Sequence, residues 1–143
     1  MNRIVIRPAD SADAPSLAAL SGQLGYPSTP AQIAARLAVL AETADAVRVA
    51  EVDGQVAGWI HVGSHRPLES EPSAEISGLV VDEAHRGQGI GRLLVEAALA
   101  WARERGYAGI RVRSNVVRAD AHRFYEGLGF QRVKTQVTFT RAV

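Results

Sequence analysis

The chain has 143 residues, of which 47% are hydrophobic and 22% charged, and this average globular composition excludes a disordered chain and a coiled coil. The 16 basic and 15 acidic residues leave a net charge of +1 and are scattered, whereas nucleic-acid binders concentrate basic residues on one face. The absence of cysteine excludes disulfides, a thiolate nucleophile and cysteine-based zinc sites. A chain of this length predicts a single domain over residues 1–143.

Two segments could be mistaken for targeting or membrane segments, and neither has the necessary apolar run. Residues 1–10 alternate polar and apolar side chains and contain Pro8, unlike the core of a signal peptide. Residues 14–35 carry no charge, but three prolines and several polar residues interrupt them, so they predict no membrane span. We therefore expect a soluble, cytoplasmic protein with neither membrane nor nucleic-acid partners.

The N-terminal third predicts a strand followed by two helices. Alternating apolar residues at the start predict a short strand that Pro8 ends. Leucines at helical spacing predict a weak helix over residues 11–24. Thr29 and Gln32 have the spacing of a capping box, which predicts the start of a second helix that ends near Glu42.

The middle of the chain predicts strands. Residues 46–52 and 55–62 flank Asp53 and Gly54, a dipeptide typical of tight hairpin turns. A polar loop then leads to a further strand over residues 74–81.

The C-terminal part predicts alternating helices and strands. The apolar spacing predicts helices over 91–105 and 118–128, a short strand at 110–113 and a final strand at 133–139. The order of elements predicts an α/β fold with a mixed central sheet sandwiched by about four helices, since the hairpin is antiparallel.

A glycine-rich loop joins the strand over 74–81 to the clearest helix. Its residues are Arg86, Gly87, Gln88, Gly89, Ile90 and Gly91. Alternate glycines let the backbone approach a ligand closely, and the helix N-terminus behind them favours an anion such as a pyrophosphate. A plain turn is the alternative, although it needs only one glycine.

Two other phosphate-binding motifs do not fit this loop. A P-loop needs a lysine followed by serine or threonine, and the only lysine of the chain is Lys134. A dinucleotide-binding fingerprint needs a later third glycine and an acidic residue after the next strand, where this chain has Ser114 and Asn115.

The loop and its flanking segments resemble the GNAT N-acetyltransferase superfamily. Residues 86–91 match the Q/R-x-x-G-x-G/A signature of that superfamily. The segments before it (75–81, Glu-Ile-Ser-Gly-Leu-Val-Val) and after it (121–130, Ala-His-Arg-Phe-Tyr-Glu-Gly-Leu-Gly-Phe) match as well. The resemblance covers the order of elements over nearly the whole chain, and it implies a GNAT-like fold.

The resemblance also implies an activity, the transfer of an acetyl group from acetyl-CoA, as co-substrate, to a primary amine. The loop amides would hold the pyrophosphate of acetyl-CoA. The backbone of Leu79, Val80 and Val81 would pair with its pantetheine arm and polarise the thioester carbonyl. Tyr125 would lie beside the sulfur and protonate the departing thiolate; its alternative role is a core aromatic residue.

Glu75 and Asn115 each have two interpretations. Some branches of the superfamily carry a glutamate at the position of Glu75 that accepts the amine proton, and a partly buried carboxylate suits this role. Alternatively, Glu75 is a solvated charge or an anchor for the substrate ammonium. Asn115 either donates to an amide of the pantetheine arm or is an ordinary turn residue.

The remaining candidates are weaker. His61 and His65 would lie about 13 Å apart on a strand, too far to share a metal, and no metal site is predicted. They are surface residues or part of an acceptor pocket, which Trp59 and Tyr26 could also line. The sequence offers no partner for His85.

A non-catalytic acyl-CoA-binding or sensing domain is the alternative to an enzyme. The presence of both Tyr125 and Glu75 favours the enzyme. The sequence does not distinguish an aminoglycoside, a polyamine, an amino acid or a protein N-terminus as the acceptor. Dimers are common in the superfamily, so the resemblance also leaves a homodimer open.

Overall fold

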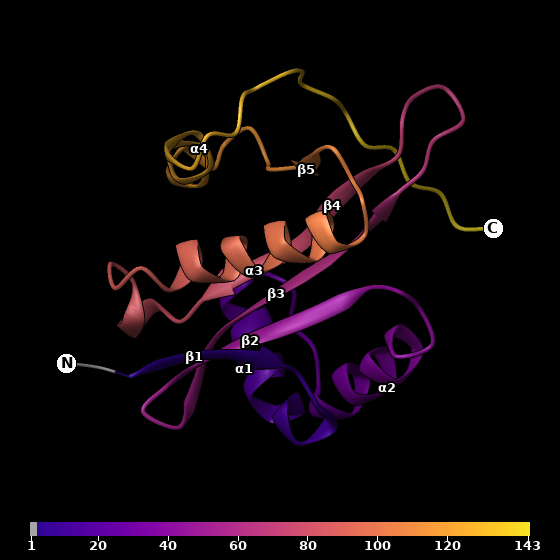
Figure 1. The fold of residues 1–143 in the computed structure, drawn as a ribbon. Coiled ribbons are helices and arrows are strands. Elements are labelled where there is room, and N and C mark those ends of the chain that lie inside the picture. Colours follow the sequence, from indigo (N-terminus) through magenta and orange to yellow (C-terminus); the bar gives the residue numbers. More distant parts are fainter. Residues whose placement is uncertain (1–2) are drawn as a thin grey trace. The chain divides into compact units, whose positions relative to one another are not determined.

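The computed structural model describes residues 3–143, which form two compact units that meet in the sequence between Val112 and Arg113. The first unit contains one five-stranded sheet in chain order (Figure 1). Its strands are β1 (Ile4–Pro8), β2 (Ala46–Val52), β3 (Gln55–His65), β4 (Ser73–Val81) and β5 (Ile110–Val112). Neighbouring strands are antiparallel except β4 and β5, which are parallel. The predicted mixed α/β fold is confirmed.

Three α-helices of the first unit cover the two faces of this sheet. The helices α1 (Ala14–Leu24) and α2 (Pro30–Leu40) lie on one side, and α3 (Ile90–Glu104) lies on the other (Figure 1). Short 3₁₀ turns, η1 (Ser11–Asp13) and η2 (Glu83–His85), precede α1 and the loop before α3.

The alternation of side chains along β3 divides the core between the two faces. A Cβ added at Gly58 would lie 3.2 Å from Leu94, so this face is covered by α3. Ile60 follows at the strand period of two and is completely buried on the same face. Trp59 and His61 therefore point to the opposite face, the one covered by α1 and α2.

Two local signals in the sequence produce the predicted structures. At the start of α2, Gln32 donates its backbone N–H to Oγ1 of Thr29 (3.1 Å), and Thr29 donates its own N–H back to Oε1 of Gln32 (3.0 Å). Between β2 and β3, Asp53 and Gly54 both adopt positive φ angles, 50° and 85°, as a tight hairpin turn requires. The capping box and the hairpin are both confirmed.

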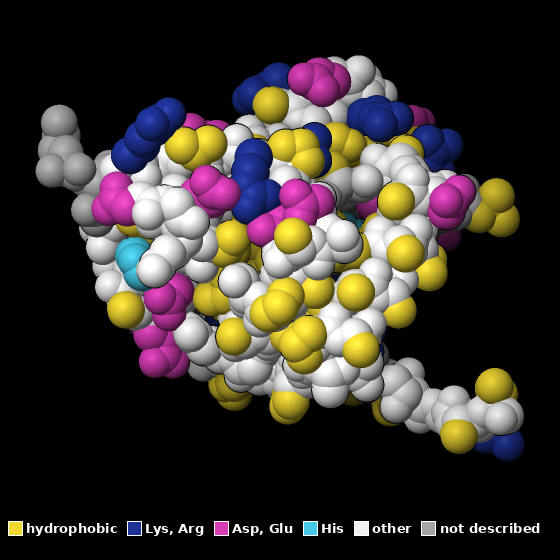
Figure 2. Space-filling view, turned by 90° about the horizontal axis from the view of Figure 1, so that it is seen from below, with side chains coloured by type: hydrophobic (Ala, Val, Ile, Leu, Met, Phe, Trp, Pro, Cys, Tyr) yellow, Lys and Arg dark blue, Asp and Glu magenta, His cyan; other side chains and the backbone are white. Residues whose placement is uncertain are grey.

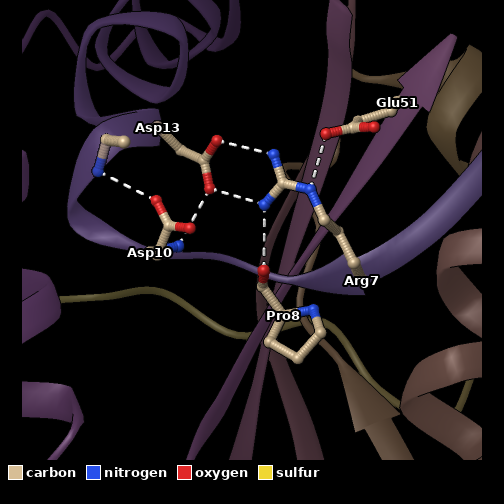
Figure 3. Close-up of polar contacts among 6 residues, drawn as sticks. Arg7, Pro8, Asp10, Asp13 and Glu51 are labelled. Carbon is tan, nitrogen blue, oxygen red and sulfur yellow. Dashed lines mark hydrogen bonds and ion pairs between the residues drawn. The ribbon is translucent and has the colours of Figure 1, made fainter. Parts of the chain in front are cut away.

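Arg7 of β1 joins the start of α1 to the sheet (Figure 3). Its guanidinium donates to both carboxylate oxygens of Asp13 at 2.8 Å and to Glu51 of β2 at 2.6 Å. Asp13 also accepts the backbone N–H of Asp10. Arg7 holds the pKa of this largely buried carboxyl group below its usual value.

A β-bulge lies in β4 at the point where β5 ends beside it. The register of β4 on β3 slips between Ile76 and Gly78 and leaves Ser77 as an extra residue. β5 pairs with β4 only from Ala74 to Ile76. Within the first unit, the edge of β4 beyond Ile76 therefore has no strand beside it.

The second unit contains the helix α4 (Ala119–Gly127), which confirms the helix predicted over 118–128. The predicted final strand at 133–139 is wrong, because residues 131–143 form no regular structure and are exposed. A strand needs a neighbour that satisfies its backbone groups, and α4 is the only regular element in 113–143. Alternating apolar residues do not supply that neighbour.

No helix in residues 3–143 is both long and apolar enough to cross a bilayer.

Candidate active site

The unpaired edge of β4 offers backbone groups next to the bulge. Asp82 donates its N–H to the carbonyl of Ala57 on β3 (2.8 Å), and the carbonyl of Val80 also faces β3, at Gly58. Because peptide groups alternate along a strand, those of Leu79 and Val81 face the unpaired edge. This part of β4 can accept an extended ligand as an added strand.

The glycine-rich loop adopts a conformation that requires its glycines. Gly87 and Gly89 have φ angles of 81° and 80°, in the left-handed region, and nothing lies within 4 Å of a Cβ added at either residue. Gly89 is the N-cap of α3, and no side chain caps the first turn of that helix. The exposed backbone from Arg86 to Gly89 therefore leads directly into a helix N-terminus suited to an anion.

Ile90 and Gly91 lie in the first turn of α3 and differ from the rest of the loop. The side chain of Ile90 is 1% exposed and packs on the sheet beside Gly58. Only the backbone of Ile90 can face a ligand, and its side chain fixes the start of α3 against the core.

Three side chains fix the beginning of the loop, and the sequence did not indicate them. Asp82 accepts a hydrogen bond from Nε2 of Gln23 in α1 (3.0 Å) and contacts Nδ1 of His85 (2.7 Å). Gln23 and His85 lower the pKa of the Asp82 carboxyl group. The link joins α1 to the segment between β4 and the loop, and it gives His85 the partner that sequence reasoning missed.

A pocket of about 390 Å³ lies on the α1–α2 side of the sheet, next to the bulge. Trp59, Tyr26 and His61, which the sequence suggested for an acceptor pocket, all line it. The other lining residues are Leu17, Ser21, Leu24, Ser28, Ile33, Arg36, Leu37, Leu40, Val47, Ser77 and Gly78. Figure 2 views the molecule from this side and shows many hydrophobic side chains at the surface.

His61 contacts a carboxylate that does not line this pocket. Its Nε2 lies 2.9 Å from Oδ2 of Asp45, the residue just before β2. A Cβ added at Gly63 would lie 2.5 Å from the same Oδ2 atom, so the glycine leaves the space that the carboxylate occupies. Nothing in the sequence pattern indicated this pair, because 16 residues separate Asp45 from His61.

Glu75 lies on the same face of the sheet but belongs to another cluster. Its side chain is 14% exposed, and its Oε2 lies 3.2 Å from Nδ1 of His65. The other ring nitrogen of His65 lies 2.7 Å from Nη1 of Arg111, the register partner of Glu75 on β5. Glu75 does not line the pocket that contains His61.

In the second unit, Tyr125 lies on α4 between two other aromatic rings. The centroids of Phe124 and Phe130 lie 5.1 Å and 5.5 Å from that of Tyr125, and both contacts are edge-on. Burial raises the pKa of the Tyr125 phenol above its usual value, against a smaller lowering by Arg118. Tyr125 therefore remains protonated at neutral pH, as a proton donor must.

Asn115 makes hydrogen bonds within the turn before α4. Its Oδ1 accepts the backbone N–H of Val117 (3.1 Å), and its carbonyl accepts the N–H of Arg118 (3.0 Å) and contacts Nε2 of His122 (2.9 Å). These bonds shape the turn before α4 and leave the side-chain amide nitrogen as the group that could donate to a ligand.

The chain resembles several N-acetyltransferases in sequence. It is 35% identical over 88 residues to N-acetyltransferase family 8 member 2 of Rattus norvegicus, covering 59% of this chain and 38% of that protein. It is 32% identical over 92 residues to N-acetylaspartate synthetase of Danio rerio, covering 64% of this chain and 32% of that protein. The aligned region thus spans less than half the length of these relatives.

Solved structures share the fold over the whole chain. Aminoglycoside N-acetyltransferase AAC(6')-Iy in complex with CoA superposes with a TM-score of 0.89 at 17% identity, covering 100% of this chain and 97% of that one. A putative acetyltransferase from Agrobacterium tumefaciens str. C58 superposes with a TM-score of 0.84 at 26% identity, covering 96% and 99% of the two chains.

The model of the Acetyltransferase (GNAT) family matches residues 18–130, from α1 to the end of the aromatic segment around Tyr125. This range contains the segment 75–81, the glycine-rich loop and the segment 121–130, which carry the resemblance in the sequence. The fold, the loop and the match agree, and the chain belongs to the Acetyltransferase (GNAT) family.

Proposed function

We propose that the protein transfers an acetyl group directly from acetyl-CoA to a primary amine. One observation carries this proposal: an unpaired edge of β4 continues into a left-handed glycine loop at the uncapped N-terminus of α3. The edge suits the amide-rich pantetheine arm, and the loop suits the pyrophosphate. The family membership and the relatives named N-acetyltransferase support the same assignment.

The chain's own residues divide into two groups in this proposal. The peptide groups of Leu79 and Val81 bind the pantetheine arm, with Val80 between them packed into the core. The backbone of residues 86–91 binds the pyrophosphate. Asn115 adds one donor, its side-chain amide.

The reaction needs groups on both sides of the thioester. The amine nitrogen attacks the thioester carbonyl, a C–N bond forms and the C–S bond breaks. Tyr125 gives its proton to the departing thiolate, a role that its raised pKa supports. Glu75 serves the amine side, as the base or as an anchor for the ammonium.

We also propose a cytoplasmic location and a homodimer. Acceptors acted on by the relatives, such as the aminoglycosides named for one structural neighbour, are candidates for the acceptor screen.

Thiol release from acetyl-CoA, measured with a panel of primary amines, tests the proposed function. We expect release that depends on the amine and yields one acetylated amine per thiol. Binding of acetyl-CoA without amine-dependent release would instead indicate an acyl-CoA-binding or sensing domain.

A further inference from the structure

We propose that Asp45 and His61 form a proton-accepting dyad at the acceptor pocket, in which His61 takes a proton from the acceptor ammonium and Asp45 positions its ring. This inference rests on the proposed N-acetyl transfer and deepens its amine side.

The hydrogen bond between the two residues fixes the tautomer of the histidine. An ionised carboxylate can only accept, so Nε2 of His61 carries the proton donated to Asp45 across 2.9 Å. The lone pair is then on Nδ1. Within residues 3–143, no hydrogen bond of the protein engages Nδ1 of His61. Nδ1 can therefore accept a proton from a ligand in the pocket that His61 lines.

The surrounding structure is built to accommodate this pair. Gly63, two residues after His61 on β3, lacks the Cβ that would collide with the Asp45 carboxylate. Thr43 accepts the backbone N–H of Asp45 at 3.1 Å and holds the segment before β2. The Asp45 carboxylate does not line the pocket, so His61 is the member of the dyad that a ligand in the pocket would contact.

The charged and titratable groups near His61 leave Asp45 as its carboxylate partner. From α2 and the loop before it, Arg36 and Tyr26 line the same pocket. On the same face of the sheet, His65 and Glu75 pair with each other at 3.2 Å. Glu75 does not line the pocket that contains His61.

Two protons leave the acceptor nitrogen during the transfer. The acceptor ammonium loses one proton to Nδ1 of His61, which later passes it to solvent. The neutral amine attacks, and as the C–N bond forms the nitrogen loses a second proton to solvent. The thiolate receives one proton from Tyr125, which regains one from solvent. The sum is one amide, one thiol and one released proton per turnover.

The pH dependence of kcat/KM for the amine tests the dyad. His61→Gln should lower kcat/KM roughly 10²-fold or more at neutral pH, and the rate should recover as the pH approaches the pKa of the amine. Asp45→Asn should also lower it, because an amide can donate to Nε2 and stabilise the wrong tautomer. Both variants should keep the acetyl-CoA-induced rise in Tm. Glu96→Gln, on the exposed side of α3, is the control for a lost carboxylate.

Gly63→Ala is a second test of the dyad, and it keeps the side chains of both Asp45 and His61. Its Cβ would displace the Asp45 carboxylate, which is the far end of a flexible side chain, so the fold should tolerate it while kcat/KM falls as in Asp45→Asn. A His61→Gln enzyme with the wild-type rate and pH profile would overturn the dyad. Loss of the acidic limb of the pH–rate profile in Glu75→Gln, with that limb intact in His61→Gln, would also overturn the dyad. Absence of any thiol release by the wild type would instead contradict the proposed function.

A separate observation, the charge of the pocket, points to the class of acceptor. None of the described residues that line the pocket is acidic, and Arg36 is its one permanently charged side chain. Leucine, isoleucine, valine and aromatic side chains form most of the wall. We infer that the acceptor has an apolar body and no second cationic group, unlike a polyamine or an aminoglycoside.

A matched pair of acceptors tests this inference. Per amino group, n-hexylamine should have a kcat/KM roughly tenfold or more above that of hexamethylenediamine, because Arg36 repels the second ammonium. Arg36→Glu should reduce or reverse this preference. Turnover that favours the diamine in the wild type would overturn the inference while leaving N-acetyl transfer in place.

Discussion

Gln23, near the end of α1, donates a hydrogen bond from Nε2 to Oδ1 of Asp82 across 3.0 Å. Its Oε1 accepts the backbone N–H of Glu83 at 3.0 Å, so one side chain holds two consecutive residues at the start of the turn that precedes the glycine-rich loop. A helix on the acceptor side of the sheet is thereby joined to the loop proposed to bind acetyl-CoA.

Gln23→Ala should weaken acetyl-CoA binding several-fold, because the loop loses two of its fixed contacts. Calorimetric titration with acetyl-CoA measures the change. Gln32→Ala is the matched control, since it removes a glutamine of the capping box of α2 at a cost of about 1 kcal/mol and has no contact with the loop. Equal affinity in the two variants would show that Gln23 only stabilises the fold.

The left-handed backbone at Gly89 should be essential for the cofactor loop. Gly89→Val places a branched side chain in open space that the ligand would occupy, and it adds strain of about 1–2 kcal/mol at φ 80°. Gly106→Val is the control, because Gly106 has φ 79°, equally open surroundings and a place beyond the other end of α3. Both variants should lose similar stability, and only Gly89→Val should lose acetyl-CoA binding. Retained affinity in a folded Gly89→Val variant would remove the loop from the site.

Tyr125→Phe should lower kcat by roughly 10²–10⁴ with acetyl-CoA affinity nearly unchanged. The hydroxyl makes no hydrogen bond to another residue in 3–143, so stability should change by less than about 1 kcal/mol. Steady-state kinetics and chemical denaturation check the two parts. A wild-type rate in Tyr125→Phe would identify this tyrosine as a packing residue and leave thiolate protonation to water.

The raised pKa of Tyr125 predicts how the unfolding free energy depends on pH, which can be measured separately from activity. Above pH ~10 the unfolded phenol ionises before the folded one, so folding becomes less favourable as the pH rises. The unfolding free energy of the wild type should therefore fall more steeply than that of Tyr125→Phe between pH 9.5 and 11 or so. Parallel curves would contradict the buried environment of the phenol.

Arg7 and Asp13 should make stability sensitive to acid. The pKa of Asp13 is lowered in the fold, so its contribution is complete above the ordinary carboxyl pKa of about 3.9 and is lost as the pH falls through the folded value. Asp13→Asn should show a flatter decline in unfolding free energy below pH 4 or so. At neutral pH, Arg7→Met should cost about 2 kcal/mol, because it leaves the buried carboxylate without its partner. Arg103→Met, at an exposed position of α3, is the control, and equal losses would exclude a special role for the pair.

Local signals in the sequence were enough for most elements of the fold. The capping residues Thr29 and Gln32, the turn at Asp53 and Gly54, and the apolar stripe of α3 each depend on nearby residues only, and the structure has all of them. The strand predicted at 133–139 depended on a distant neighbour, which an alternating pattern cannot reveal.

The residues of the candidate site also fall into two groups, those indicated by a local pattern and those that depend on distant contacts. The glycine-rich loop is one contiguous segment, and its residues could be named from the sequence. The pairs Asp45 with His61 and Gln23 with Asp82 join residues 16 and 59 positions apart, and they exist only because the sheet and α1 bring them together. The bulge at Ser77 likewise depends on the register between β3 and β4.

The stoichiometry of amine-dependent turnover tests the central claim most directly. With an accepted primary amine and labelled acetyl-CoA, the protein should form one N-acetylated amine for each thiol released, and Tyr125→Phe should slow both equally. Tight acetyl-CoA binding with no acetylated product from any member of a broad amine panel would contradict the account.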